Sequence, residues 1–398
     1  MTDDGGAAYW QRNLWVCVFG TFTTIVAMTL LLPFLPLYIE QLGVSDPVAI
    51  VEWSGAAYGA TFLTAAIFAP LWGRLGDQYG RKLMLIRASL GMAVAMSLIG
   101  LSQNVYQLVG LRLLAGLLGG YSSGSMILVA TQTPRVNTAW ALGMMSSGIM
   151  AGSLAGPLIG GFLPPLIGIR MTFLAAGAII FVAFLATTFL IKEDWRPRRR
   201  GGAKPAVGFA SVRDKRPVIA MLVTGMLLMF ANMSIEPIIT VYVAQLVPDA
   251  GQITIVAGIV MAAAALGSII SASWLGKLAD RIGHWTVIIG SLLVCALLLI
   301  PQAFVTAGWQ LIVLRFLMGL ALGGLLPCVA TVIRHNVPER SAGSILGYST
   351  SAQYVGQVAG PLMGGFVGGH FGMRAVFLGT AVLMAAGALY GWVSRPRT

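Results

Sequence analysis

The sequence predicts an all-α membrane protein whose twelve transmembrane helices form two six-helix pseudo-repeats. Apolar residues make up 57% of the 398-residue chain and charged residues 10%, whereas about 25% of the residues of a soluble protein are charged. Long uncharged runs recur along the chain, and landmarks of the first half return about 203 residues later. Too few polar side chains are present to cover a water-facing surface, which excludes a soluble enzyme.

Twelve uncharged runs correspond to the predicted helices. Most of them meet or exceed the roughly 20 residues that a helix needs to cross about 30 Å of hydrocarbon, and the shorter ones end at a charge inside a span. Their apolar residues do not alternate with polar ones, as they would in the strands of a membrane barrel. In chain order, the runs are 13–39, 53–73, 88–111, 113–134, 136–169, 171–191, 218–235, 250–276, 282–314, 316–333, 342–373 and 375–394.

The distribution of Lys and Arg predicts the orientation of the chain. If the N-terminus is cytosolic, the inner loops and the two termini hold 21 of the 25 basic residues, and cytosolic loops are the ones enriched in Lys and Arg. Both termini are therefore expected in the cytosol. The net charge of +12 then follows from topology, with some attraction to anionic lipid, and requires no nucleic-acid partner.

The second half of the chain repeats the first. The segment LRLLAGLLGG returns as LRFLMGLALGG, and GPLIGGF returns as GPLMGGF. Parallel repeats of this kind are related by an axis along the membrane normal. We therefore expect a six-helix bundle over 1–191, a basic linker over 192–217 and a second six-helix bundle over 218–398. The linker buries too little apolar surface to fold alone, so it is either a flexible cytosolic tether or in part an amphipathic segment on anionic lipid.

A short motif between the second and third predicted helices combines glycines with charges. It contains Gly73, Asp77, Gly80, Arg81 and Lys82. Asp77 is an acid among cations, placed to accept hydrogen bonds or to face a helix N-terminus, where negative charge is favoured. The second half keeps this acid as Asp280 but lacks the basic pair. Because the motif occurs twice at the same helix of a twelve-helix duplication, it resembles the signature A loop of the major facilitator superfamily, where it gates transport.

The fifth predicted helix carries small residues at a spacing of four. They are Gly148, Gly152, Gly156 and Gly160, with Pro157 beside them. Such a stripe lets helices approach closely in lipid, and the proline removes a backbone donor and bends the helix. The pattern resembles the antiporter signature C of the same superfamily, which implies a drug/proton exchanger. The eleventh predicted helix repeats the stripe, so a packing role in both halves stays open.

Three charged residues lie inside predicted spans. Arg112 in the fourth helix resembles signature B of the superfamily, and Arg315 is its counterpart in the second half. Glu236 is the acid that lies well inside a span, at a depth near that of the two arginines. A charge at membrane depth is costly and indicates function, so we expect these residues to couple protons to substrate. The alternatives are arginines satisfied by backbone carbonyls, a structural ion pair, or an incidental position of Glu236 in the cavity.

Further side chains suit a substrate cavity. The polar ones are Asn232, Gln353, Tyr354 and Gln357, and the aromatic ones include Phe34, Tyr38 and Tyr242. Aromatic faces attract cations, and the 19 methionines supply the flexible surfaces typical of promiscuous pockets. Each of these residues, taken alone, is also consistent with helix packing or an interfacial belt.

The resemblance to the superfamily extends over the whole chain, through stretches such as LPFLPLYIEQLGV, ATQTPR and GRKLMLIRASLGM. It implies a monomeric multidrug efflux protein that exports chemically varied small-molecule drugs in exchange for protons. It also implies a place in a bacterial inner membrane and a part in antibiotic resistance. The alternative on the same fold is a proton-coupled or facilitative importer of a small metabolite such as a sugar. Such an importer needs more polar cavity residues than the sequence offers.

The sequence carries no pattern for catalysis or ATP hydrolysis. There is no G-x-x-x-x-G-K-[ST] phosphate loop, no H-E-x-x-H motif and no pair of catalytic carboxylates. The three cysteines fall in apolar helices without C-x-x-C spacing, and the three histidines form no metal-ligand pattern. We therefore expect neither an enzyme, nor a cofactor, nor a metal site.

Overall fold

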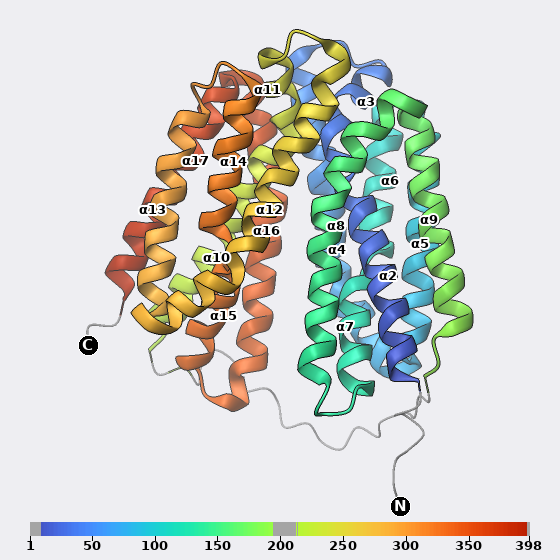
Figure 1. The fold of residues 1–398 in the computed structure, drawn as a ribbon, viewed down its shortest axis with the longest axis vertical. Helices are drawn as coiled ribbons and strands as arrows, with labels where there is room; N and C mark the ends of the chain where they lie inside the picture. Colours follow the sequence, from blue (N-terminus) through green and yellow to red (C-terminus); the bar gives the residue numbers. More distant parts are fainter. Residues whose placement is uncertain (1–8, 194–211, 213, 396–398) are drawn as a thin grey trace, which may run out of the picture. The chain divides into compact units, whose positions relative to one another are not determined.

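Helices account for nearly all regular structure in the computed structural model, which describes residues 9–193, 212 and 214–395. Within these ranges no residue belongs to a strand, as expected for an all-α membrane protein. The described residues divide into two compact units, one within 1–43 and 60–201 and the other within 44–59 and 202–398. In each unit the helices run side by side along its length (Figure 1).

The order of the helices reflects the duplication. Those of the first half are α2 (Trp10–Thr29), η1 (Leu32–Phe34), α3 (Leu35–Gln41), α4 (Pro47–Tyr79), α5 (Arg81–Gly100), α6 (Val105–Leu118), α7 (Tyr121–Gln132), α8 (Thr138–Ile167) and α9 (Ile169–Leu190). Those of the second half are α10 (Arg216–Ile235), η3 (Glu236–Ile238), α11 (Ile239–Leu246), η4 (Ala250–Gln252), α12 (Ile253–Ile282), α13 (His284–Gln302), α14 (Gly308–Leu322), α15 (Leu325–His335), α16 (Glu339–Phe371) and α17 (Met373–Ser394). Helix α4 begins in the second unit and ends in the first.

The helices confirm the predicted fold class. Eleven of them, counted with their short continuations, are long and apolar enough to cross a membrane within the described ranges. The one predicted span missing from these eleven, 342–373, corresponds to α16, which has 33 residues but carries polar side chains along its middle. A long helix that keeps polar groups at membrane depth is expected to turn them toward protein or a cavity rather than toward lipid.

The limits of the three expected parts of the chain stay predictions. The structure groups residues 44–59 with the second unit, although they lie within the predicted N-terminal bundle of 1–191. Most of the predicted linker, 192–217, lies outside the described residues, since 194–211 and 213 are not among them.

Four of the spans predicted as continuous helices are interrupted. Two breaks fall at glycine pairs: Gly120, between α6 and α7, has φ +100°, and Gly324, between α14 and α15, has φ +80°. Residues with a Cβ atom rarely adopt this left-handed conformation. The other two breaks are η1 and η3, which contain Pro33 and Pro237, and proline lacks the N–H group that a helix needs. The breaks occur at equivalent positions of the two repeats.

The motif expected as a loop after the second helix is helical instead. Helix α4 continues past Asp77 and ends before Gly80, whose φ is +95°. In the second half, α12 continues past Asp280 and ends before Gly283, whose φ is +93°. The expectation of an extended loop is wrong because a single left-handed glycine is enough to end one helix and begin the next.

A buried tyrosine holds the same place in each repeat. The Tyr38 hydroxyl donates to the carbonyl oxygen of Ile99 at 2.6 Å, and the Tyr242 hydroxyl donates to that of Gln302 at 2.8 Å. Each tyrosine also packs on a phenylalanine, with ring centroids 5.2 and 5.1 Å apart. These matching contacts show that the duplication extends to the side-chain packing of each bundle.

The glycine stripe of α8 packs on α2, and its copy on α16 packs on α10. A Cβ atom added at Gly156 would lie 3.0 Å from the carbonyl oxygen of Val26, and one added at Gly360 would lie 2.6 Å from that of Phe230. The other stripe glycines of α8 that face α2 are Gly148, Gly152 and Gly160. Pro157 is buried within the same helix. The packing role that the sequence left open therefore exists in both halves.

We expect Gly156→Val and Gly360→Val to reduce the stability of the folded protein to a similar extent, because either side chain meets backbone of the neighbouring helix. Overpacking of this kind costs about 1–3 kcal/mol. The measurement is the midpoint of thermal unfolding in detergent, together with the amount of protein recovered from membranes. Gly143→Val is the matched control on α8, since nothing lies within 4 Å of a Cβ added there. Tolerance of valine at Gly156 or Gly360 would contradict the packing interpretation.

Candidate functional site

Glu236 lies where the seventh span is interrupted, at the junction of α10 and η3. Its Oε1 atom accepts a hydrogen bond from Nδ2 of Asn232, one turn earlier, at 2.8 Å. Both side chains are half-buried. The carboxyl group is therefore neither sealed in the core nor fully hydrated, which suits a group that exchanges a proton or a cation.

Arg315 is a buried cation in the same unit. Its exposed fraction is 1%, its Nη1 atom lies 3.8 Å from Sδ of Met318, and its Nε and Nη2 atoms have no hydrogen-bond partner in the described part of the chain. Its charge acts on Glu236, but none of the ion pairs found within the described ranges joins these two residues. The two charges are thus near enough to influence each other without being in direct contact.

Arg112, the counterpart of Arg315, lies in the first unit and is also 1% exposed. The Thr61 hydroxyl of α4 donates to the carbonyl oxygen of Arg112 at 3.0 Å. Gly116, one turn later, lets α6 approach the backbone of α4, because a Cβ atom there would lie 2.8 Å from the carbonyl carbon of Thr61. The structure therefore places Arg112 at a close helix crossing of the first unit, and within the second unit it places Arg315 near Glu236.

The polar residues of α16 face α10, the helix that leads into Glu236. Gln357 places Nε2 3.3 Å from Sδ of Met229 on α10, and Gln353 places Nε2 3.4 Å from Oγ of Ser349 one turn earlier. These two glutamines and Tyr354 are half-buried. We use the name polar cluster of the second unit for six polar residues of its helices, of which Asn232 bonds to Glu236 and Gln357 contacts α10. Its members are Asn232, Glu236, Arg315, Gln353, Tyr354 and Gln357.

Phe34, Tyr38 and Tyr242 are not placed as predicted. Their exposed fractions are 0%, 0% and 4%, and the two tyrosines use their hydroxyls on backbone carbonyls inside the bundle. An aromatic ring in that position is held by packing and presents no face to a ligand. The interpretation of these three as cavity residues is therefore corrected to bundle packing, the alternative that the sequence left open.

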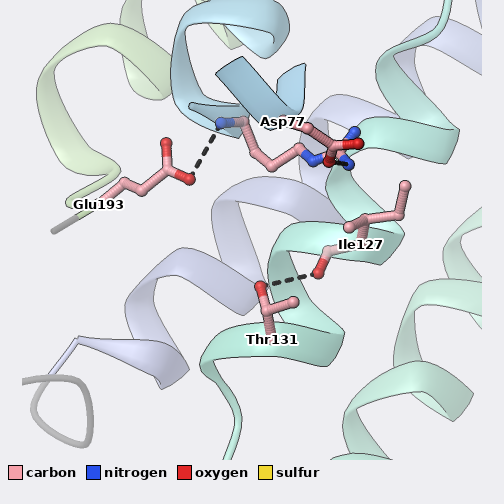
Figure 2. Close-up of polar contacts among 5 residues, drawn as sticks. Asp77, Ile127, Thr131 and Glu193 are labelled. Carbon is pink, nitrogen blue, oxygen red and sulfur yellow. Dashed lines mark hydrogen bonds and ion pairs between the residues drawn. The ribbon is translucent and has the colours of Figure 1, made fainter. Parts of the chain in front are cut away.

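Two acids hold the end of α4 and the start of α5. Asp77 forms an ion pair with the Arg81 guanidinium, and the backbone N–H of Arg81 donates to Oε1 of Glu193 at 3.0 Å (Figure 2). The N–H of Lys82 donates to Oε2 of Glu193 at 2.6 Å. A carboxylate at a helix N-terminus is favoured by the free N–H groups and by the helix dipole. Of the two alternatives that the sequence offered for Asp77, the structure shows the first, since its carboxylate accepts a hydrogen bond from Arg81, and Glu193 lies at the helix N-terminus.

Glu193 is a residue that the sequence analysis missed. It precedes the undescribed part of the linker and is fixed there by its neighbour, because the carbonyl oxygen of Lys192 accepts hydrogen bonds from Asn13 at 2.7 Å and from Gln132 at 3.2 Å. Only its place as an acid directly after the sixth helix hinted at this role. Gly73 contributes no contact, since nothing lies within 4 Å of a Cβ added there.

In the second copy of the motif, Asp280 has a weaker charge partner than Asp77 has in the first. Oδ1 of Asp280 lies 3.6 Å from Nε2 of His284, which occupies the position of Arg81. The imidazole is charged only when protonated, whereas the guanidinium is charged at every physiological pH. The His284 ring also lies edge-on against His335, with centroids 6.0 Å apart. The asymmetry expected from the missing basic pair is thus present in the contacts.

The described residues contain no group of three or more His, Cys, Asp or Glu side chains that could hold a metal ion. Cys17, Cys295 and Cys328 are free and buried. The chemistry available in the polar cluster is therefore that of one carboxyl group, one guanidinium and several amides, which can exchange protons and bind cations or polar groups.

The chain matches the sequence model of the Major Facilitator Superfamily over residues 17–308 and 252–398. It is 42% identical over 386 residues to "Multidrug resistance protein MdtG" of Proteus mirabilis, which covers 97% of this chain and 96% of that protein. It is 43% identical over 389 residues to the protein of the same name of Salmonella typhimurium, which covers 98% and 96%.

Among solved structures, the chain is similar to the inward-facing, unoccupied form of a bacterial homologue of the human lysosomal transporter Spinster, with a TM-score of 0.78, 15% identity and 97% of both chains covered. The nucleoside transporter NupG gives a TM-score of 0.76 at 13% identity, with 97% of this chain and 100% of that chain covered. At these identities the likeness concerns the fold alone.

Asp77→Asn is expected to lower export by about tenfold, within the range by which a local charge contact biases a two-state equilibrium. The substitution removes the partner of Arg81 at the junction of α4 and α5. Because Asp77 is largely exposed, its ion pair adds little to stability, so the amount of folded protein should stay the same. The measurement is drug export from cells that hold equal amounts of each variant.

Asp280→Asn is the matched variant in the second repeat. Since the contact of Asp280 with His284 is longer than that of Asp77 with Arg81, export should fall by only about twofold. Equal losses in the two variants would contradict the asymmetry.

Proposed function

Because the chain belongs to the major facilitator superfamily, we propose that it is a secondary active transporter that exports lipophilic or cationic drugs in exchange for protons by alternating access. Identity of 42% and 43% to two MdtG proteins over nearly the whole chain supports multidrug export. The glycine stripe of α8, which resembles the antiporter signature, supports exchange over uptake.

The observation that carries the proposal is the placement of Glu236. It lies in a break of a membrane helix, half-buried, with Asn232 as its hydrogen-bond partner and the buried charge of Arg315 nearby. Burial makes the ionised carboxylate costly unless a positive charge compensates it. A bound drug cation or a bound proton each supplies that compensation, and either one excludes the other.

Exchange follows from this competition. On the cytosolic side the ionised Glu236 binds a cationic drug, and on the outer side a proton displaces the drug by neutralising the carboxylate. When neither is bound, Arg315 partly compensates the charge. The amides of Gln353 and Gln357 offer polar contacts to the substrate, and the neighbouring methionines offer an adaptable apolar surface.

The proposal also covers the membrane and the topology of the chain. We infer that the chain is a monomer in a bacterial inner membrane with both termini and residues 192–217 in the cytosol. The supporting observation is that 21 of the 25 Lys and Arg residues fall on one side of the predicted topology.

Transport in inverted membrane vesicles tests the function. The expected result is uptake of a lipophilic cation that an imposed pH gradient drives and that collapse of the gradient stops, without added ATP. Glu236→Gln, which mimics the protonated acid, should reduce cation transport by about tenfold or more, since one uncompensated charge contact at low dielectric is worth over 1.4 kcal/mol. A neutral drug should be affected less.

Glu40→Gln is the control for that experiment, because Glu40 is an exposed acid at the end of α3 and should transport normally. Glu236→Asp should retain part of the activity. Normal transport of the cation by Glu236→Gln under a normal pH gradient would show that Glu236 is not the coupling residue, and dependence on ATP would overturn the proposed function.

Cysteine labelling tests the location. Val136, between α7 and α8, is 94% exposed, and Ser45, before α4, is exposed as well. In intact spheroplasts an impermeant thiol reagent should label Ser45→Cys at least about tenfold faster than Val136→Cys, because the membrane separates the two loops. The three native cysteines are buried and serve as the unlabelled background. Faster labelling of Val136→Cys would reverse the topology.

A further inference from the structure

Helices α4 and α16 meet in a tight seam inside the second unit. Its members are Val48, Val51, Glu52 and Gly55 on α4 and Pro361, Gly365, Gly369 and His370 on α16. A Cβ atom added at Gly365 would lie 3.0 Å from the carbonyl oxygen of Val51, and one added at Gly369 would lie 3.2 Å from that of Val48. The two backbones thus approach closely, with only the small side chains of α4 such as Val48 beside the glycines, and the seam is closed.

An ion pair lies at the end of this seam. Nδ1 of His370 is 3.4 Å from Oε1 of Glu52 and 3.1 Å from the carbonyl oxygen of Phe366, one turn earlier on α16. Both neighbours of Nδ1 are acceptors, so this nitrogen carries a hydrogen. The side chains of His370 and Glu52 are 46% and 40% exposed. Water and protons on the same side of the membrane can therefore reach both members of the pair.

Charged groups on or beside the elements that pack around the seam have contacts of their own. Asp46, before α4, accepts a hydrogen bond from the N–H of Ala49 at 3.0 Å. Glu236 in η3 is bonded to Asn232, and Arg374 at the start of α17 lies over the ring of Phe304. Within the described residues, Glu52 is the charged group within ion-pair distance of the imidazole.

The pair has no counterpart in the other repeat. Leu166 and Val256 occupy the positions 204 residues away from His370 and Glu52. Since the fold is built twice and this ion pair once, the bundle packing does not require it. An ion pair that is present in one repeat and missing from the other needs an explanation other than folding.

We propose that His370 is a positioning residue of the transport cycle, which closes the α4–α16 seam through Glu52 when it is protonated and releases the seam when it is neutral. The proposal rests on the proposed function, because it takes the seam to lie at the outer face, where the topology puts the start of α4 and the end of α16. Helix α4 runs from the second unit into the first, so opening of the seam would free its first turns from α16.

The direction of the effect follows from the charges. Protonated His370 is attracted to Glu52 and to the carbonyl groups at the C-terminal end of α16, so the pair stabilises the closed seam at low pH. This contribution is lost when His370 is neutral, because the imidazole is charged only when protonated. Outer protons would therefore close the outer side, which turns the proton-loaded transporter toward the cytosol, as exchange requires.

A buried cysteine in the seam reports its opening. Val51 is 3% exposed, so Val51→Cys should react with an impermeant thiol reagent only when the seam parts. The rate is divided by that of Ser45→Cys, an exposed position before the same helix, which removes the pH dependence of the thiol itself. Between outer pH 5.5 and 8 the ratio should rise about two- to fivefold, the range that a half-exposed ion pair supplies.

Four variants in the Val51→Cys background identify the pair. His370→Gln and Glu52→Gln should each give a high ratio that does not change with pH, and the double variant should resemble either one. His370→Lys, which keeps the charge, should give a low ratio at both pH values. His335→Gln, a histidine on another helix, is the matched control and should keep the normal pH dependence.

An unchanged pH dependence in His370→Gln, or no labelling of Val51→Cys at pH 8, would overturn the proposal. Labelling needs neither a drug nor a pH gradient. The labelling experiment therefore tests the proposal about the seam independently of Glu236 and of the proposed exchange. The vesicle experiment tests those two.

Discussion

Inside hydrocarbon, every backbone N–H and C=O group must find a partner within the protein, and this requirement governs both units. A continuous helix satisfies this requirement through its own hydrogen bonds. Where a helix breaks, other groups of the protein must bond to the backbone N–H and C=O groups that are left free. The breaks at Pro33 and Pro237 lead into short segments whose tyrosines, Tyr38 and Tyr242, donate to backbone carbonyls of another helix. At the glycine pair beside Gly120, the Arg87 guanidinium donates to the carbonyl oxygen of Gly119 at 2.8 Å. At the glycine break a side chain thus bonds to a backbone carbonyl of the break itself, and at the proline breaks the tyrosines tie the segments that follow to a neighbouring helix.

In the same low-dielectric environment, a charged side chain at depth indicates a functional site. Lipid solvates neither an acid nor a guanidinium, so Glu236 and Arg315 persist at depth only if the protein or a bound species compensates them. Glu236 has one amide donor and Arg315 keeps two donor atoms without a hydrogen-bond partner in the described residues. A structural ion pair would satisfy both groups directly. Incomplete compensation is instead what a site needs if protons or cations are to enter and leave it.

Much of this architecture could be predicted from the sequence, because span length, hydropathy and repeat spacing are local properties of the chain. The contacts between distant residues could not. Glu193 caps α5 from the far end of the first bundle, and Glu52 meets His370 across almost the whole sequence. Phe34 was misassigned to the cavity for the same reason, since its residue type does not reveal whether a ring faces a pocket or a neighbouring helix.

The duplication distinguishes the residues that stabilise the fold from the residues proposed to act in transport. Packing elements come in two copies: the glycine stripes of α8 and α16, the tyrosine contacts and the left-handed glycines at the helix ends. Asp77 and Arg112 also have counterparts, in Asp280 and Arg315, but Glu236 and His370 do not. Glu236 has Leu32 as its counterpart, and His370 has Leu166. Two equal copies of a carboxylate would bind protons and drug equally in both bundles, whereas a single copy lets one bundle carry the charge while the other supplies a scaffold against which it can move. Single-copy charges on a two-copy scaffold are therefore where the coupling of this transporter is to be sought.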